Sequence, residues 1–357
     1  MKKATMKKIL CGMLLAAAAL GAYLALAQRA ELERIARPLP GAARDAGGPV
    51  DQTILLDDVR TLASDAFEGR RTGSAGSRKA QAYLRQRFRA LGLMSFGAQK
   101  GAAHEAANNA DYAQPFAFRT RSVKKLFVPG QPYQTDYPEA VNLIGYLRGS
   151  AAPDKFLVVS AHYDHLGVRQ GRLYPGADDN ASGVAALLAV AAYFKAHPPR
   201  HSVIFAAFDG EELGLRGARA FMAAPPVPRA QLIANLNLDM LAHNDSNEIV
   251  AVGAYPWPVL KALLGEAAGR SAVRVLAGHD RPLLVAGMVE NWNDSSDHAP
   301  FNDAGIPFLY FGVADHADYH APSDTFEHIN PAFFGRVANL VVDVAALMER
   351  DLDRLAR

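Results

Sequence analysis

Residues 202–212, with the sequence SVIFAAFDGEE, join an uninterrupted apolar run to a cluster of carboxylates. The run at 202–208 does not alternate between polar and apolar residues, which is typical of a strand buried on both faces of a sheet. Asp209, Glu211 and Glu212 follow at once. In open α/β sheets ligands bind beyond the carboxyl ends of the strands, so this stretch predicts a functional site at that edge.

The same pattern of short apolar runs separated by helical segments extends along the chain from about residue 140. It predicts an α/β fold, a three-layer α/β/α sandwich with a mostly parallel (mixed) central sheet, in a single domain over residues 51–357. Residues 94–140 are polar and weakly patterned, and we expect a lid or a strand-rich insertion there. Strands are predicted at 141–147, 156–162, 202–208, 234–241, 249–252 and 308–311. Helices are predicted at 77–93, 182–195, 213–222, 258–270 and 331–352.

The N-terminus has the organisation of an export signal. An uncharged run at residues 9–27 ends in Ala25-Leu26-Ala27 and follows four lysines, Lys2, Lys3, Lys7 and Lys8. This pattern predicts a signal peptide cleaved after Ala27, with an uncleaved anchor as the alternative because the run is nearly long enough to span a bilayer. Residues 28–50 are rich in Ala, Pro, Gly and charge, and we expect a flexible tether there.

Charge and cysteine content narrow the class of protein. The chain has a formal net charge of +2, which becomes −2 once the four N-terminal lysines are removed. No long basic run remains, so nucleic acid is excluded as a partner on electrostatic grounds. The only cysteine is Cys11, and a chain cleaved after Ala27 would have none. Export without disulfides suits a bacterial periplasmic or secreted enzyme, with membrane contact only through an uncleaved residue 9–27 segment.

Side chains of metal-binding types follow other predicted strands as well. His162 and Asp239 each come directly after an apolar run, Asp178 and Asp179 precede the helix predicted at 182–195, and His320 lies in a loop after the last strand. Carboxylates packed this closely are costly unless a positive charge compensates them, and a divalent metal supplies it. Histidine with Asp or Glu and no thiolate is typical of a catalytic zinc or related divalent site.

Each of these residues has an ordinary structural explanation when it is taken alone. Asp178 and Asp179 could belong to a turn in which Asn180 or Ser182 caps the following helix. Acidic residues at a helix start, such as Glu211 and Glu212, complement the helix dipole. Their occurrence in order, at successive strand ends and loops, favours one shared site.

The motifs also resemble, in order, those of the M28 family of zinc peptidases, which includes bacterial secreted aminopeptidases. The motifs are HYDH (162–165), PGADDNASG (175–183), FDGEELGLRGARAF (208–221), NLDM (237–240), SDHAPF (296–301) and YHAPSDTFEHI (319–329). Residues 64–84 resemble the segment that precedes the family's catalytic core, so the resemblance runs over residues 60–330. It implies the zinc-exopeptidase (phosphorylase/hydrolase-like) fold.

The resemblance implies two zinc ions held close together. His162 and Asp239 would bind one ion, Glu212 and His320 the other, and Asp179 would bridge both. Two metals about 3.5–4 Å apart can share one carboxylate and one activated water, which agrees with this assignment.

Further roles follow from the same resemblance. Glu211 would be the general base, and Asp164 would orient His162 by accepting its free ring N–H. Asp178 does not match a direct ligand, and we expect it to support the site from behind. The family's cis peptide bond would lie between Asp179 and Asn180.

Other nearby residues are expected to act indirectly or structurally. Asp297, within Ser296-Asp297-His298, is expected to support the ligands, and Tyr319 to contact substrate or pack. Three further histidines near the motifs, His165, His243 and His316, are expected to be structural.

These assignments predict a zinc-dependent exopeptidase, an aminopeptidase that hydrolyses the N-terminal peptide bond of peptide substrates. A carboxypeptidase is the main alternative, because the metal ligands do not separate the two. It would need a cation in the pocket, for which Arg169, Arg172 and Arg281 are candidates. A glutaminyl cyclase with one zinc and a non-catalytic ectodomain are less favoured, because the full GADDNASG pattern and all five ligands are present.

Overall fold

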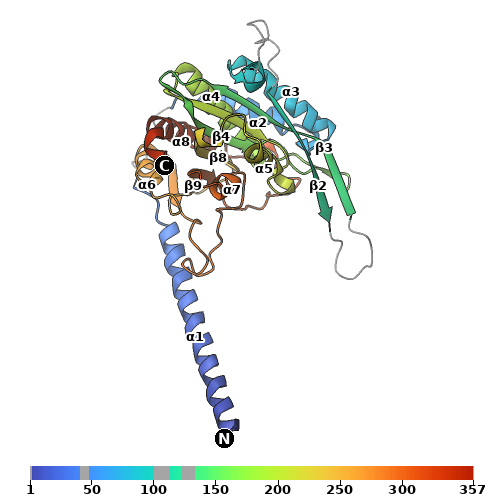
Figure 1. Ribbon diagram of the computed structural model, residues 1–357. Helices are drawn as coiled ribbons and strands as arrows, with labels where there is room; N and C mark the ends of the chain where they lie inside the picture. Colours follow the sequence, from blue (N-terminus) through green and yellow to red (C-terminus); the bar gives the residue numbers. More distant parts are fainter. Residues whose placement is uncertain (1, 41–47, 100–111, 123–132, 357) are drawn as a thin grey trace.

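The computed structural model describes residues 2–40, 48–99, 112–122 and 133–356. Within these residues the central element is a nine-stranded mixed sheet in the order β1-β3-β7-β4-β8-β11-β9-β10, with β2 paired to β3 (Figure 1). The strands are β1 (Met94–Ser95), β2 (Ala113–Ser122), β3 (Tyr133–Leu147), β4 (Ala152–His162), β7 (His201–Phe208), β8 (Leu232–Leu238), β9 (Glu248–Val252), β10 (Arg274–Ala277) and β11 (Phe308–Gly312). A separate hairpin joins β5 (Gly167–Arg169) to β6 (Arg172–Tyr174).

The centre of the sheet is parallel. β4 pairs in parallel with both β7 and β8, and β8 pairs in parallel with β11. Antiparallel pairs flank this centre, β3 with β7 on one side and β9 with β11 on the other. The carboxyl ends of β7, β4, β8 and β11 therefore meet along one edge of the sheet.

Helices cover both faces of the sheet, as predicted. The larger core packs one face beneath α2 (Gln52–Leu62), α3 (Ala75–Ala90), α4 (Gly183–Ala196), α6 (Leu260–Arg270), α8 (Pro331–Arg350) and α9 (Leu352–Leu355). The smaller core lies on the other face beneath α5 (Arg216–Ala223) and α7 (Ala299–Asp303). Its centre is formed by fully buried aromatic rings, Phe208, Phe221 and Phe301. These two layers confirm the three-layer α/β/α sandwich.

The predicted elements correspond to observed ones, with differences at their ends. β8 ends at Leu238 instead of residue 241, because the chain turns into the site and Met240 adopts a positive φ of 61°. The helix predicted at 331–352 is interrupted at Asp351, where φ is −99° and ψ is 12°. β10, α2 and α7 were not predicted, since each presents a short or mixed apolar pattern.

Residues 94–140 are rich in strands, because β1, β2 and the first part of β3 lie within them. β2 and β3 form a long antiparallel pair that extends beyond the rest of the sheet (Figure 1). The role of this segment as a lid stays a prediction, and residues 100–111 and 123–132 lie outside the described residues.

The N-terminal helix α1 (Lys2–Ile35) projects from the domain (Figure 1). Its last part, Gln28–Ile35, was expected to belong to a flexible tether, and that expectation is wrong for these residues. The reason is that they are held by the domain: Ile35 is buried, and Arg34 donates through Nη1 to the carbonyl oxygen of Ala277 at 2.9 Å. Residues 41–47 of the expected tether lie outside the described residues.

One helix among the searched residues, α8, is long and apolar enough to cross a membrane by length and composition. Most of that helix is buried in the larger core, which explains its apolar composition.

Candidate metal centre

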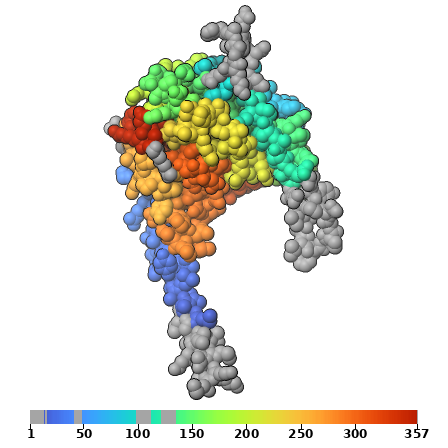
Figure 2. Space-filling view, in the orientation of Figure 1, coloured from blue at the N-terminus to red at the C-terminus, as the bar shows by residue number. Residues whose placement is uncertain are grey.

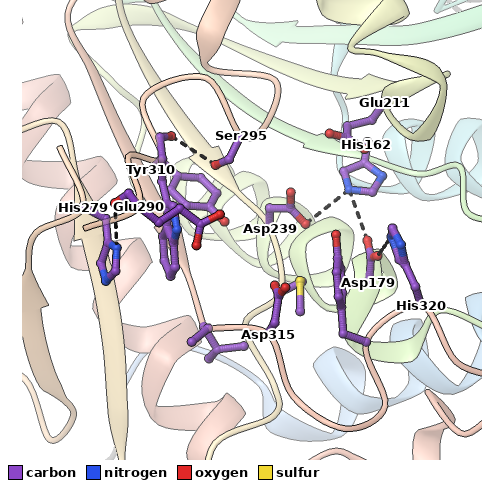
Figure 3. Close-up of a pocket in the computed structure, with 15 residues that line it drawn as sticks. His162, Asp179, Glu211, Asp239, His279, Glu290, Ser295, Tyr310, Asp315 and His320 are labelled. Atoms are coloured by element: carbon purple, nitrogen blue, oxygen red, sulfur yellow. Dashed lines mark hydrogen bonds and ion pairs between the residues drawn. The ribbon is translucent and has the colours of Figure 1, made fainter. Parts of the chain in front are cut away.

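The parallel strand ends bring the predicted site residues together (Figure 3). His162 is the last residue of β4, and Asp239 directly follows β8. Glu211 begins a short 3-10 turn after β7, Asp179 lies in the turn that precedes α4, and His320 is in the loop after β11. Side chains that are far apart in the sequence therefore converge at a single edge of the sheet.

Asp179 lies at the centre of the cluster. Its Oδ1 is 3.4 Å from Nε2 of His162, whereas its Oδ2 is 3.1 Å from Nε2 of His320. The two oxygens of one carboxylate thus face two different groups of side chains, which is the arrangement expected for a bridging ligand.

The first group, which we call the inner half, comprises His162 and Asp239 with Oδ1 of Asp179. Nε2 of His162 is 3.2 Å from Oδ1 of Asp239, and both residues are buried. The other oxygen of Asp239 accepts a hydrogen bond of 2.7 Å from the hydroxyl of Ser296. That hydroxyl in turn accepts a hydrogen bond of 2.9 Å from Nδ2 of Asn237, so Asp239 is held in one orientation.

The second group, the outer half, comprises Glu212, His320 and His165 with Oδ2 of Asp179. Nε2 of His320 is 3.2 Å from Oε2 of Glu212. His165 is fully buried, and its Nδ1 is 2.8 Å from Oε1 of Glu212 and 3.5 Å from Oδ2 of Asp179.

His165 was expected to be structural, and the structure places its ring directly against the outer-half carboxylates Glu212 and Asp179. Its place in the HYDH motif, three residues after His162, indicated that it could lie near the metal ligands. The direction of a side chain in the irregular segment beyond a strand does not follow from alternation, so its contacts could not be predicted from the sequence.

His162 is oriented from its other ring nitrogen. Nδ1 is 3.1 Å from the backbone carbonyl oxygen of Asp164 and 3.7 Å from that residue's Oδ1. Asp164 thus lies beside the free ring nitrogen, but the nearer acceptor is its carbonyl and not its carboxylate. The carboxylate instead accepts the backbone N–H of Glu211 at 3.1 Å, which positions the start of the Glu211-Glu212 pair.

Asp178 is fully buried and supports the turn that carries Asp179. Its Oδ1 accepts the backbone N–H of Ala242 at 2.6 Å, and its Oδ2 is 3.0 Å from Nε2 of His316. The ring of His316 stacks on that of His243, with centroids 3.8 Å apart, so both histidines have structural contacts. The peptide bond between Asp179 and Asn180 is cis, as the resemblance implied.

Asp324 and Arg70 hold the same turn and were not singled out in the sequence. The carboxylate of Asp324 accepts the backbone N–H groups of Asp178 at 2.8 Å and of Asp179 at 3.0 Å. The fully buried guanidinium of Arg70 donates to the carbonyl oxygens of Pro175 at 2.7 Å and of Gly176 at 2.8 Å. Arg70 is therefore a fixed positive charge beneath the carboxylates.

Burial raises the pKa of several carboxyl groups in the site, but hydrogen bonds and nearby charges outweigh it for Asp239 and Glu212. It raises the pKa of Glu211 well above its usual value, and the charge of Asp239 raises it further. Burial likewise raises the pKa of Asp179, with Glu212 adding to the effect, and raises the pKa of Asp297 to about 8. For Glu212, burial acts in the same direction, but hydrogen bonds from His165 and His320 outweigh it and hold the pKa below its usual value.

The donor set of the two halves fits zinc. Within each half, three residues offer ring nitrogen or carboxylate oxygen atoms that all lie within 4.8 Å of one another. In the inner half these residues are His162, Asp179 and Asp239. In the outer half they are His165, Asp179 and Glu212. In both halves the donors are imidazole and carboxylate without a thiolate, the set found in catalytic zinc sites. Buried carboxylates this close together also need a cation for compensation.

A cavity of about 400 Å³ opens next to the metal centre (Figure 3). Besides the metal-centre residues its lining contains two further carboxylates, Glu290 and Asp315, and three large aromatic rings, Trp292, Tyr310 and Tyr319. The ring of Tyr319 stacks on that of His320 at 3.9 Å. No lysine or arginine is found among the described residues that line it, so none of Arg169, Arg172 and Arg281 does.

Known proteins resemble this chain in sequence. It is 30% identical to the aminopeptidase YwaD of Bacillus subtilis (strain 168) over 205 residues, 53% of this chain and 40% of that protein. It is 28% identical to a glutamate carboxypeptidase 2 homolog of Caenorhabditis briggsae over 201 residues, 50% of this chain and 24% of that protein. The chain thus spans less than half the length of these curated relatives.

The fold is also found among solved structures. The structure of BSAP, a zinc aminopeptidase from Bacillus subtilis, superimposes with a TM-score of 0.60 over 83% of this chain and 95% of that chain, at 18% sequence identity. At this identity the likeness concerns the fold alone.

The sequence pattern characteristic of one peptidase family covers more than half of the chain. It matches residues 142–345, which include both halves of the metal centre and the parallel core of the sheet. The chain therefore belongs to peptidase family M28.

Proposed function

We propose that this protein is a zinc-dependent aminopeptidase that removes N-terminal residues from peptides. The observation that carries the proposal is the cavity beside the metal centre, which is lined by Glu290 and Asp315 and, among its described residues, by no lysine or arginine. An acidic cavity attracts the ammonium group of a peptide N-terminus and repels a C-terminal carboxylate.

The metal centre would hold two zinc ions through this chain's own residues. His162 and Asp239 would bind one ion, Glu212 and His320 the other, and Asp179 would bridge them with its two oxygens. When bound, zinc lowers the pKa of a coordinated water and polarises the scissile carbonyl. The spacing of Asp179 between Nε2 of His162 and Nε2 of His320 supports this assignment.

Glu211 would act as the general base. Its side chain lines the cavity, whereas that of the adjacent Glu212 contacts His165 and His320, so the two glutamates have different surroundings. Glu211 would accept a proton from the attacking water and later donate it to the leaving amine. Burial favours the protonated carboxyl that must exist between these two steps.

A carboxypeptidase is the second candidate, because one of the relatives is a glutamate carboxypeptidase 2 homolog. Recognition of a C-terminal carboxylate would require a cation in the cavity. Among the described lining residues outside the metal centre, only His279 could supply one, and its Nδ1 is 3.0 Å from the carbonyl oxygen of Glu290. The lining therefore favours the amine.

We also propose that the protein is exported and acts in the periplasm or outside the cell. The support is the N-terminal sequence, in which lysines precede an uncharged run that ends in small residues.

The test is a panel of peptides with free or acetylated N-termini, assayed with zinc before and after a chelator. We expect hydrolysis of free-amine peptides only, loss of turnover with the chelator, and recovery on addition of zinc. Turnover of acetylated peptides from their C-termini would identify a carboxypeptidase. Cyclisation of an N-terminal glutamine would identify a glutaminyl cyclase, and no turnover with zinc bound would indicate a non-catalytic ectodomain.

A further inference from the structure

A short apolar loop, residues 283–288, is exposed on the surface of the domain. The side chains of Leu283, Leu284, Val285 and Met288 all lie in solvent, and Leu284 is 65% exposed. Apolar side chains that are exposed together in one loop mark a site of contact with another apolar surface.

The apolar loop lies directly against α1. A Cβ added to Gly287, which has a φ of 61°, would come within 1.9 Å of the backbone nitrogen of Gln28 and 2.3 Å of the carbonyl oxygen of Leu24. Only glycine permits this approach of backbone to backbone. The loop (orange) and α1 (blue) are seen side by side where the helix leaves the domain (Figures 1 and 2).

The contact falls at one end of the uncharged run in α1. That run, residues 9–27, has 19 residues, which as a helix span about 28 Å and match a hydrocarbon core of about 30 Å. The side chains of Leu20, Tyr23 and Leu26 are exposed along it. The lysines lie at the far end, as in segments whose N-terminus stays in the cytoplasm. The apolar loop is therefore level with the point at which such a helix would leave a bilayer.

The end of α1 is joined firmly to the segment that carries the apolar loop. Glu31 is buried and lies 2.5 Å from Nη2 of Arg34 and 3.4 Å from Nη1 of Arg281, two residues before the loop. Ile35 packs at Gly278, where an added Cβ would lie 2.4 Å from its Cγ1. These contacts fix the position of the apolar loop along the axis of α1.

We propose that α1 is retained as a membrane anchor and that the apolar loop at 283–288 inserts into the outer face of the same bilayer beside it. Exposed apolar side chains at the level of the interface gain stability by leaving water for the lipid. Glu290 and Trp292, which line the cavity, follow the loop within four residues. The second membrane contact therefore holds the cavity at the membrane surface. The inference does not depend on the proposed aminopeptidase activity.

The test uses the full chain inserted into phosphatidylcholine–phosphatidylglycerol vesicles. In a Cys11→Ser background, Leu284→Cys carries an environment-sensitive NBD label, and Met288→Cys provides a second position in the loop. The matched control is Ile54→Cys, because Ile54 is also a large apolar residue, 47% exposed, but lies on α2 in another part of the domain. Lipids with a nitroxide near the headgroup serve as quenchers.

We expect the labels at 284 and 288 to emit at shorter wavelength and to lose most of their fluorescence to the quencher, with no change at 54. Labels at 284 and 288 that behave like the one at 54 would overturn the insertion of the loop. The N-terminus of the protein isolated from cell membranes is also determined. A chain that starts at residue 28 would show that α1 is cleaved and would refute the anchor. Peptide turnover in the same preparation reports on the proposed activity separately.

Discussion

The two halves of the metal centre use the same donor types but differ in exposure. In the inner half, the side chain of His162 is 1% exposed and is fixed by the carbonyl of Asp164, while Ser296 holds Asp239. In the outer half, the side chain of His320 is 38% exposed and lies in a loop. Because the donor types are the same, burial of the ligands and the hydrogen bonds that hold them should decide which metal is held more tightly.

The outer half has a compensating feature. His165 is buried behind Glu212 and brings a second imidazole to that half, whereas the inner half has only His162. Oε1 of Glu212 therefore faces a fixed nitrogen even though His320 lies at the surface.

The largest effect is expected at the carboxylate that the halves share. Asp179→Asn should reduce bound zinc from two ions per chain towards none and turnover to background, because both halves lose a charged oxygen. The matched control is Asp178→Asn, since Asp178 contacts Ala242 and His316 instead of the cluster. Elemental analysis of both variants measures the outcome, and equal zinc loss in the two would refute a bridging role specific to Asp179.

The next effect separates metal binding from catalysis. Glu211→Gln should keep both ions while kcat falls by about 10²–10⁴, because a positioned general base contributes that much. Both zinc ions should remain bound because Glu212, and not Glu211, contacts the imidazoles of the outer half. Zinc content and kcat are measured on the same sample, and an unchanged kcat would exclude Glu211 as the base.

A smaller effect concerns the order in which the ions leave. Titration of the native protein with a chelator should remove one ion before the other, because the outer half is accessible through His320. His320→Ala should abolish the early step and leave one ion, whereas His162→Ala should abolish the late step. Release is followed with a zinc-sensitive dye. Simultaneous release of both ions would show that exposure of His320 does not distinguish the halves.

The smallest effect is expected at His165. His165→Gln should weaken zinc binding by the outer half by about 10–100-fold, the loss typical when a group that contacts a metal ligand is changed. His197→Gln is the control, since His197 is exposed and hydrogen-bonds within its own helix end. Calorimetry measures the affinity of each half. If the zinc affinity of the outer half is the same in His165→Gln as in the native protein, the role of His165 is purely structural.

Much of the site could be predicted from the chain because its residues are tied to regular elements. His162 ends an apolar strand, Asp239 and Glu212 follow one closely, and parallel neighbours place such positions at one edge. His165, Glu290 and Asp315 could not be placed in this way. They lie in irregular segments, where no periodicity states which way a side chain points.

The sequence by itself determined the fold class, the family and the order of the site residues, because apolar periodicity and local motifs are properties of contiguous residues. Only the tertiary structure decided that the two oxygens of Asp179 face different groups, that His165 reaches Glu212, and that the apolar loop meets α1. Each of these depends on distances between segments that are remote in the chain. Such distances are set by packing across the whole sheet, and no single stretch of sequence contains them.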